Sequence, residues 1–509
     1  MAWPRKSPLF PLWGDGRADD YILMFREEGY RMTMPSRTRE AASPPSRSRT
    51  SLFAGRADLE NDNPMRALVV LAVPSVGLFF FNSLLALVDT IFVSWLGELP
   101  MAAMSFTLPV NLCIFATLEC VGGGAAALMG RHLGRHDPAS ARHIARSALA
   151  LLYLICLLST PMVLPSVSGA VFGAIGAGGN PELLRLCWLY NLWIPIMLPF
   201  GGYTYIANTT ARAQGDTLTP FKAIALANTV NLILDPLLIF GFGWGISGAA
   251  IATWIARVVS VLYLLRKMPR ISAIPVPPLL HPRTDLTAWW GPILRIGIPI
   301  ALTTASVALG MGGTNRILTN YGHHAVSAWM LGLRIEDLAF NFLFGLYMAL
   351  IPYIAYNYGR RDLARMTAGL RSAFLLGMIL MCSIGAVIYV WPHLFLGLFR
   401  PPPETADMAV RAIRASVPSY PCSVFMILVG AFFVGIGQSL YGTIVQILRS
   451  IVFRISAAWL FFLWFAPRHI WWFQSVASLL GTMVSAAFLA LVLRRLRRTM
   501  APEDKDPAP

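Results

Sequence analysis

Residues 227–253 read ANTVNLILDPLLIFGFGWGISGAAIAT, and this stretch contains the pattern that predicts the fold. Two apolar runs flank the turn sequence GFGWG. Each run is about as long as the ~20 residues that a helix needs to cross a bilayer. The stretch therefore predicts two membrane-spanning helices joined by a Gly-rich turn. Within these apolar runs lie the polar residues Asn231, Asp235 and Thr253.

The same pattern extends over most of the 509 residues. Charged residues make up only 13% of the chain, whereas soluble proteins contain about 25%, so the composition argues against a water-soluble enzyme. Apolar runs long enough to span fall at 66–95, 103–130, 144–167, 183–211, 220–241, 246–266, 290–316, 324–352, 368–391, 408–436, 441–465 and 470–493. We predict an all-α integral membrane protein with twelve transmembrane helices.

The net charge of +16 has two interpretations. In a soluble protein it would indicate nucleic-acid binding, but membrane proteins collect Lys and Arg in their cytoplasmic loops. The basic residues here follow the even-numbered spans and lie at Arg131, Arg135, Arg142, Arg146, Arg212, Lys222, Arg266, Lys267, Arg270, Arg283, Arg295, Arg360, Arg361, Arg365, Arg371, Arg494, Arg495, Arg497 and Arg498. We therefore predict a multi-pass protein of the cytoplasmic (inner) membrane, with both termini in the cytoplasm and no nucleic-acid partner.

Residues 1–62 differ from the rest of the chain because they are rich in Arg, Ser and Pro and contain no spanning run. We expect a disordered cytoplasmic extension without a cleavable signal peptide, or alternatively a true start at Met65. Residues 499–509 form a short cytoplasmic tail. The six cysteines show neither disulfide nor zinc spacing, so we interpret them as buried apolar residues.

The two halves of the chain repeat one another. Matching residues of the two halves are separated by the same number of positions: Pro74 and Pro299, Gly97 and Gly322, and Gly134 and Gly359. Gly215 and Gly437 are separated by nearly the same number. Because six is an even number of spans, corresponding helices run in the same direction. We predict two pseudo-symmetric six-helix lobes, 63–266 and 290–498, joined by a basic, Pro-rich cytoplasmic linker at 267–289. Such repeats are typical of secondary transporters with a central cleft.

Ionisable residues inside spans are rare and indicate function, because burying a charge in hydrocarbon is costly. Asp89, Asn231, Asp235, Thr253 and Tyr190 lie at similar depths, roughly 10 Å from the predicted outer end. Two carboxylates with amide, hydroxyl and phenol groups suit a shared proton or a small cation such as Na⁺. The structural alternative is that Asp235 makes only a local hydrogen bond before the proline at 236 and that Asp89 faces the outer interface. The second repeat lacks both carboxylates, which favours the functional interpretation.

Three further acids are possible secondary polar sites. Glu119 lies deep in the second span, where it relays protons, binds a cationic substrate or makes only a local hydrogen bond. Glu336 and Asp337 lie near mid-membrane in the eighth span. Arg334 on the same helix, and Arg449 and Arg454 on the eleventh span, could pair with them. We expect a structural ion-pair cluster there, because unpaired buried charge is costly.

An enzymatic function lacks the necessary residues. The one histidine cluster, at His132, His136 and His143, lies in a basic loop with Asp137 as its only nearby acid. That is too little for a metal centre or an acid–base site. We therefore predict that the protein is not an enzyme and binds neither an organic cofactor nor a metal, apart from a coupling ion.

Five segments together resemble the multidrug and toxic compound extrusion (MATE) family. They are VDTIFVSWLG (88–97), LGRHD (133–137), RAQGDTLTP (212–220), the opening stretch (227–253) and YIAYNYGRRDLAR (353–365). The resemblance covers essentially all of 64–498. It implies two lobes around a V-shaped cavity and export of organic cations or other amphipathic compounds against H⁺ or Na⁺. We expect a monomer whose partners are these small molecules and the lipid bilayer.

The resemblance is closest to the DinF-type branch, because the seventh span lacks the acid expected of the other prokaryotic branch. It implies a cation site formed by Asp89, Asn231, Asp235 and Thr253, with Tyr190 as a neighbour. It also implies that the first helix bends at Pro74. The alternative is a flippase for lipid-linked sugars of the same superfamily. Its cavity would contain several Arg residues, and few Arg residues lie within the spans predicted here.

Overall fold

The computed structural model describes residues 57–96, 98–175, 180–271, 286–397, 399 and 402–500. In the first half, the long helices are α2 (Pro64–Ser94), α3 (Glu98–Gly134), α4 (Pro138–Ser159), α6 (Pro181–Asn191), α7 (Trp193–Ala213), α8 (Leu218–Pro236) and α9 (Gly245–Ile271). In the second half, they are α10 (Trp290–Leu318), α11 (His323–Gly359), α12 (Leu363–Val390), α14 (Pro403–Ser416), α15 (Ser419–Gly435), α16 (Ser439–Ile447), α17 (Arg454–Trp464) and α18 (Phe473–Met500).

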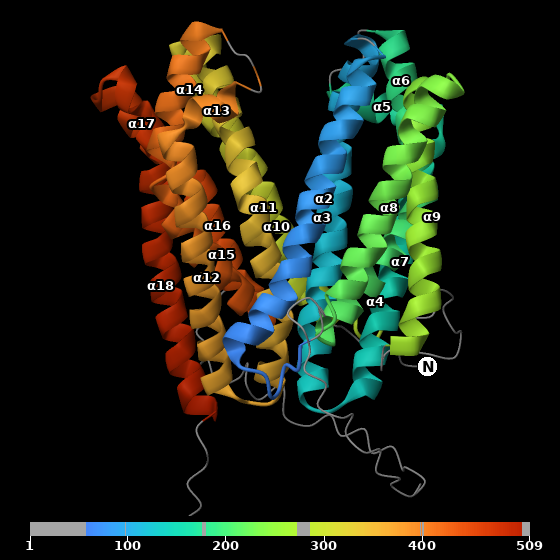
Figure 1. Ribbon diagram of the computed structural model, residues 1–509, viewed down its shortest axis with the longest axis vertical. Helices are drawn as coiled ribbons and strands as arrows, with labels where there is room; N and C mark the ends of the chain where they lie inside the picture. The colour runs from blue at the N-terminus through green and yellow to red at the C-terminus, as the bar shows by residue number, and fades with distance from the viewer. Residues whose placement is uncertain are drawn as a thin grey trace, which may run out of the picture. The chain divides into compact units, whose positions relative to one another are not determined.

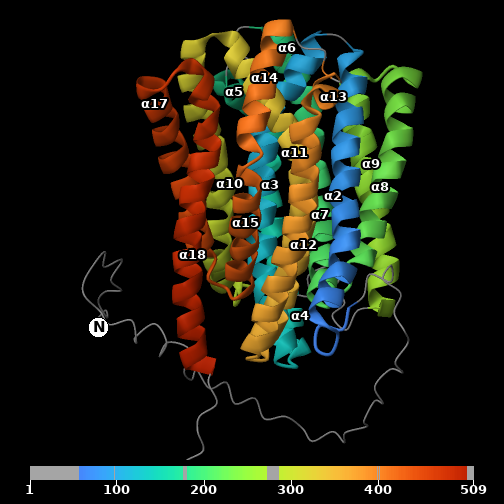
Figure 2. The same cartoon turned by 60° about the vertical axis from the view of Figure 1, so that its left-hand side comes forward.

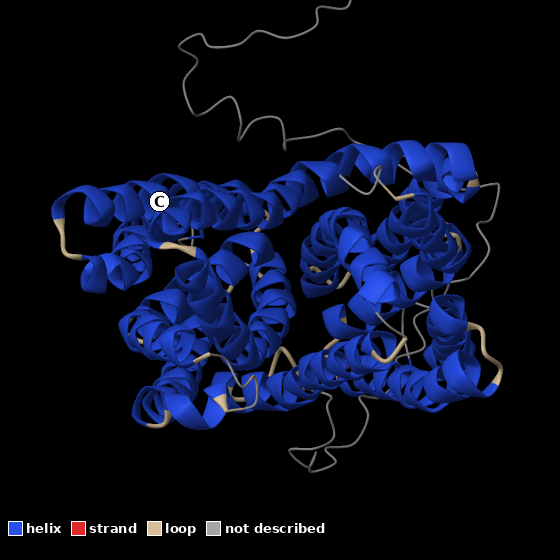
Figure 3. Ribbon diagram, turned by 90° about the horizontal axis from the view of Figure 1, so that it is seen from above, coloured by secondary structure: helices blue, strands red, loops and turns tan. Residues whose placement is uncertain are grey.

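Shorter helical segments connect or extend these helices. They are η1 (Thr160–Val163), α5 (Pro165–Ile175), the π-helical turn η3 (Leu237–Gly241), η4 (Thr319–Tyr321), α13 (Pro392–Leu396), the π-helical turn η5 (Leu448–Phe453) and η6 (Pro467–Trp472). The described part of the chain contains no strand (Figure 3).

The predicted all-α membrane fold is confirmed. Eleven of the described helical segments are long and apolar enough to cross a membrane. The twelfth span is the pair α14 and α15, which bend by 54° at the break between them. Within each half of the molecule the long helices run side by side along the vertical direction of Figures 1 and 2.

The internal repeat is visible in the backbone. His136 and Arg361, which are separated by the same number of positions as the matching residues of the two halves, both adopt a positive φ, of 58° and 60°. The next residue in each half is an aspartate that begins a helix: Asp137 accepts a hydrogen bond from the Ser140 N–H at 3.0 Å, and Asp362 accepts one from Arg365 at 2.9 Å. An aspartate at this position satisfies a backbone donor of the first helical turn. The two loops are therefore copies of one local structure.

The ends of α3, α11 and α18 that carry the basic loops are called the basic end below, which is the lower end in Figure 1. We predict that it faces the cytoplasm. Helices α2 and α3 of the first half pack against α10 and α11 of the second. Glycines make this contact possible, because a Cβ at Gly134 would overlap the Tyr356 carbonyl, and one at Gly297 would overlap the Cys120 carbonyl. Small residues at a helix interface let backbones approach closely.

Side chains add to the contact between the halves. Arg131 donates a hydrogen bond to the Ile436 carbonyl at 2.8 Å, and its guanidinium lies 4.8 Å from the centre of the Tyr358 ring. Nearer mid-membrane, Asn341 donates to Ser83 at 2.7 Å. Beyond that level α2 and α11 diverge toward the end opposite the basic loops (Figure 1). The two halves are therefore held together at the basic end.

Residues 57–62 belong to this closure, although the sequence predicts that they end a disordered extension. Ala57 donates to the Gly215 carbonyl at 3.1 Å, and Glu60 forms an ion pair with Arg360 at 3.0 Å. Arg365 donates to the Asp62 carbonyl at 2.6 Å. Residues 1–56, 272–285 and 501–509, where most of the extension, most of the linker and most of the tail are predicted, lie outside the described residues. The division into lobes at 63–266 and 290–498 stays a prediction.

Candidate ion-coupling site

The two carboxylates singled out by the sequence come together between α2 and α8. Asp89 lies near the end of α2, Asp235 lies near the end of α8, and these helices pack against each other. The Asp89 and Asp235 side chains are within hydrogen-bonding reach of one another. Two carboxylates can hydrogen-bond directly only when one of them carries a proton. The pair is therefore a place where a proton can be held.

Asn231 completes the buried part of the site. Its Nδ2 donates to Asp235 Oδ1 at 3.1 Å, one helical turn along α8, and both residues are only 1% exposed. Asp89 Oδ1, Asn231 Oδ1 and Asp235 Oδ2 are buried and have no hydrogen-bond donor in the described residues. Buried polar atoms are normally paired, and orphaned oxygens are the ligands that a proton or a hard cation requires.

The two remaining predicted members differ in their placement. Tyr190, at the end of α6, lies near both carboxylates. Thr253 of α9 is half-buried, and its hydroxyl donates to the Ala249 carbonyl at 3.1 Å rather than to either carboxylate. Its oxygen can still accept a hydrogen bond, because a hydroxyl has two lone pairs. The described contacts therefore bring four of the five predicted residues together and leave Thr253 outside their hydrogen bonds.

The backbone around the pair is irregular. Asp235 precedes Pro236, which has no N–H to donate, and the π-helical turn η3 follows directly. Single π turns occur frequently at functional sites. On the other side, Pro74 is buried inside α2, fifteen residues before Asp89. Proline inside a helix removes one backbone hydrogen bond, so α2 has a weak point on the basic-end side of the pair.

A second polar pair lies two helical turns closer to the basic end. Asn228 Nδ2 donates to Asn82 Oδ1 at 3.1 Å, again between α8 and α2. Each asparagine is seven residues before one of the carboxylates, so both helices carry the spacing Asn-x₆-Asp. This pair was not predicted from the sequence, although the shared spacing is the signal that would have found it.

Asn82 connects the site with a cavity lined mostly by the first half of the molecule, with Met348 of α11 completing its wall. The cavity encloses about 300 Å³, within the usual size of ligand pockets, and neither Asp89 nor Asp235 lines it. Its apolar wall includes Phe79 and Phe115, and its polar wall includes Glu119. A smaller pocket toward the second half of the molecule shares several of the same residues.

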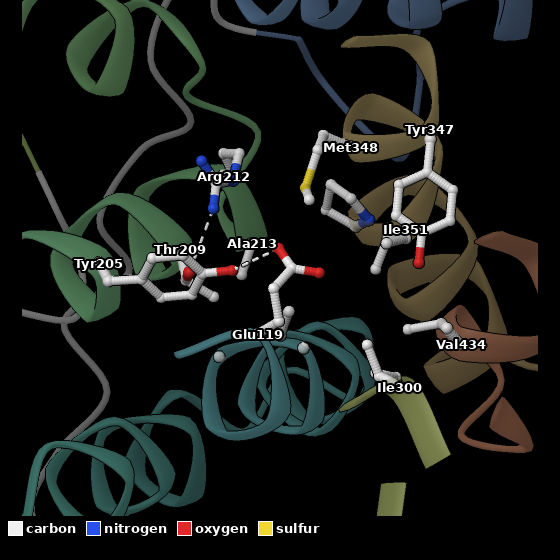
Figure 4. Close-up of a pocket in the computed structure, with 14 residues that line it drawn as sticks. Glu119, Tyr205, Thr209, Arg212, Ala213, Ile300, Tyr347, Met348, Ile351 and Val434 are labelled. Carbon is white, nitrogen blue, oxygen red and sulfur yellow. Dashed lines mark hydrogen bonds between the residues drawn. The ribbon is translucent and has the colours of Figure 1, made fainter. Parts of the chain in front are cut away.

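Figure 4 shows the polar corner that the two pockets share. Glu119 projects from α3, and Tyr205 of α7 donates a hydrogen bond to its Oε1 at 3.0 Å. Arg212 lies on the same side and donates to the Thr209 hydroxyl at 3.2 Å, while Tyr347 of α11 lies across the pocket. Glu119 is thus held by another helix, and not by a local hydrogen bond. From the sequence Arg212 is expected to be a loop charge, whereas its side chain lines both pockets.

The acids of the eighth span form a separate cluster. Glu336 is buried near Arg449, Arg454 and Gln474, while Asp337 is exposed with Arg334 nearby. The expected neighbours are therefore present. No direct ion pair within 4.0 Å joins them among the ion pairs of the described residues.

Comparison with known proteins decides the family. The model of the family described as MatE matches residues 74–237 and 299–460. The two matches begin at 74 and 299, the first pair of positions that the sequence repeat matches. The chain belongs to the MatE family. The predicted MATE membership is therefore confirmed, and the protein is a multi-pass membrane transport protein of this family rather than an enzyme.

Individual relatives agree with this assignment. The chain is 25% identical to the multidrug export protein MepA of Staphylococcus aureus over 452 residues, 87% of this chain and 96% of that protein. It is 31% identical to a FAD transporter of Shewanella oneidensis over 316 residues, 60% of this chain and 67% of that protein.

Solved structures share the fold. One described as the outward-facing conformation of a multidrug resistance MATE family transporter superposes with a TM-score of 0.80 at 23% identity, covering 86% of this chain and 98% of that chain. A MOP superfamily transporter from Pyrococcus furiosus gives a TM-score of 0.79 at 23% identity with the same coverage. The helical fold of this chain therefore has solved structural counterparts.

Proposed function

We propose that this MatE-family protein is a secondary active antiporter that exports amphipathic organic compounds in exchange for H⁺ or Na⁺. The observation that carries the proposal is the Asp89–Asp235 pair, in which two carboxylates from different helices lie within hydrogen-bonding reach. A fixed scaffold does not need this arrangement, because placing two like charges together in a membrane protein is costly unless an ion is bound. The Asn231 hydrogen bond orients Asp235 toward that role.

The pair couples ion and substrate through α2. With an ion bound, Asp89 and Asp235 attract one another through it, and α2 is held against α8. When the ion leaves, the two charges repel, and α2 is free to change its course at the weak point near Pro74. The Asn82–Asn228 bond lies between the pair and the cavity, so a movement of α2 changes the cavity wall directly. Exchange requires that substrate and ion each favour a different conformer.

The substrate class follows from the cavity and the relatives. The wall is apolar and aromatic with a few polar groups, as in sites for small amphipathic molecules. The relatives named as a multidrug export protein and a FAD transporter support a cargo of this kind. We expect the protein to act as a monomer.

Reconstituted transport tests the proposal. Purified protein in liposomes is loaded with a fluorescent amphipathic dye, and a pH gradient or a Na⁺ gradient is applied separately. We expect one of the gradients to drive dye movement, and we expect Asp235→Asn to abolish the gradient dependence. Glu336→Gln is the matched control, because it removes a buried carboxylate in the second half of the molecule.

Three outcomes would contradict the proposal. Gradient-driven dye transport by Asp235→Asn at the normal rate would remove the pair from the mechanism. Loss of coupling in Glu336→Gln, with Asp235→Asn unaffected, would move the site to the second half. If neither gradient moves the dye and the liposomes instead translocate a lipid-linked sugar, the protein is a flippase.

A further inference from the structure

The cavity in the first half of the molecule has an unbalanced charge. Three of its lining residues carry full charges, namely Glu119, Arg212 and Arg257. Two positive charges against one negative charge leave one net positive charge in an otherwise apolar wall. Arginine does not lose its proton in proteins, so this charge is permanent.

Arg257 is the residue without a partner. It lies near the middle of α9, twelve residues from the helix start, and forms no hydrogen bond or ion pair with another residue in the described part of the chain. Its side chain lines the cavity. A charge placed in the membrane interior without a partner is costly, and such residues characteristically face a cavity and bind its contents.

Arg212 approaches the same cavity from the end of α7. Its one hydrogen bond goes to the neutral Thr209 hydroxyl at 3.2 Å, which leaves further N–H donors available. The one carboxylate in the wall, Glu119, already accepts a hydrogen bond from Tyr205 at 3.0 Å. Two guanidinium groups that line one small cavity are suited to a phosphate or carboxylate, since each guanidinium can bind such a group through two parallel hydrogen bonds.

The aromatic part of the cavity wall indicates what kind of group accompanies the anion in the ligand. Phe79 and Phe115 line the cavity beside these charges, and Tyr205 adds a third aromatic ring. Aromatic side chains bind flat ring systems by stacking, which adds to the gain from buried apolar area. We infer that this cavity binds aromatic anions, with the anionic group on Arg257 and Arg212 and the ring against the phenylalanines. The inference narrows the substrate class of the proposed exporter and rests on that function.

Equilibrium binding tests the inference without any ion gradient. Riboflavin and flavin mononucleotide share one fluorescent ring and differ by a phosphate. Their binding to the full-length protein in lipid nanodiscs is followed by flavin fluorescence. A charge-assisted hydrogen bond contributes about 1.5–3 kcal/mol, so we expect the phosphate to increase affinity by about 10- to 150-fold. Arg257→Gln should remove most of this preference, whereas Arg316→Gln, an exposed arginine of α10 outside the cavity, should retain it.

Two further variants separate the possible failures. Glu119→Gln removes the negative charge from the wall and should strengthen binding of flavin mononucleotide, a gain that a damaged fold would not produce. Asp235 lies outside the cavity wall, so Asp235→Asn should change the affinities for both flavins by the same factor and keep their ratio, and loss of ion coupling is thereby distinguishable from loss of the phosphate preference. Equal affinity for the two flavins, or a phosphate preference that survives Arg257→Gln, would overturn the inference. Tighter binding of farnesyl diphosphate than of flavin mononucleotide would assign the arginines to a lipid diphosphate and would also overturn it.

Discussion

Gly297→Ala should open the basic end of the molecule. Gly297 lies in α10, where a Cβ would overlap the backbone carbonyl of Cys120 in α3. A side chain can rotate away from a clash, but a carbonyl inside a helix cannot, so α3 and α10 must separate. The same helix supplies the control, because a Cβ at Gly312 would meet no other atom within 4 Å.

The size of the effect follows from the clash. Forcing an extra methyl group into a packed contact costs about 1–3 kcal/mol. Only the conformer closed at the basic end incurs this cost, so the ratio of open to closed molecules should rise by about 5- to 150-fold. Replacing glycine by alanine also stabilises a helix by about 1 kcal/mol, but this gain is common to both conformers and to Gly312→Ala.

Spin labels across the basic end measure the change. Arg135 and Arg361 are exposed and lie in the two repeated loops, next to glycines whose backbones are in close contact. With the six native cysteines replaced, labels at Arg135→Cys and Arg361→Cys should report a short distance in the parent protein and a larger long-distance fraction in Gly297→Ala. An unchanged distribution in Gly297→Ala, or an equal change in Gly312→Ala, would refute the closure deduced from the glycine contacts.

Three further predictions concern the neighbouring contacts. Asn228→Leu breaks the hydrogen bond to Asn82 and should reduce the amount of dye moved per unit of ion gradient, while the protein stays folded. Unchanged coupling would show that this hydrogen bond does not connect the Asp89–Asp235 pair with the cavity. Glu60→Gln removes a partly buried ion pair with Arg360. The loss of about 1 kcal/mol should raise the ratio of open to closed molecules at the basic end by up to about fivefold. An unchanged distance between the same spin labels would show that residues 57–62 do not stabilise the closed conformer. Glu336→Gln should lower the thermal midpoint in detergent but leave ion coupling intact, and a loss of coupling would assign this acid a transport role.

The parts of the fold that local sequence determines were predictable. Span lengths follow from bilayer thickness, and the turns carry Gly and Pro, so all twelve spans could be located. The repeated loops were equally readable, because an aspartate beginning a helix acts within three residues of its own position. The carboxylates stood out because charges are rare in apolar runs.

The features that depend on how helices face one another were not predictable. The Asn82–Asn228 bond requires the register between α2 and α8, which no single segment contains. Arg212 sits at a helix end, where the sequence indicates only topology, and its direction into the cavity depends on the packing of α7. Residues 57–62 contain no apolar run, yet backbone and ion-pair contacts from both halves hold them at the basic end.

The most direct test of the central claim runs the exchange in reverse. An outward gradient of dye is imposed on liposomes with equal pH and equal Na⁺ on both sides, and the ion that moves in the opposite direction is recorded. Because coupling between two ligands is reciprocal, the parent protein should move H⁺ or Na⁺ against the dye. Asp235→Asn should release dye without ion movement. Ion movement that persists in Asp235→Asn would contradict the account, because the carboxylate pair would then not be the site of exchange.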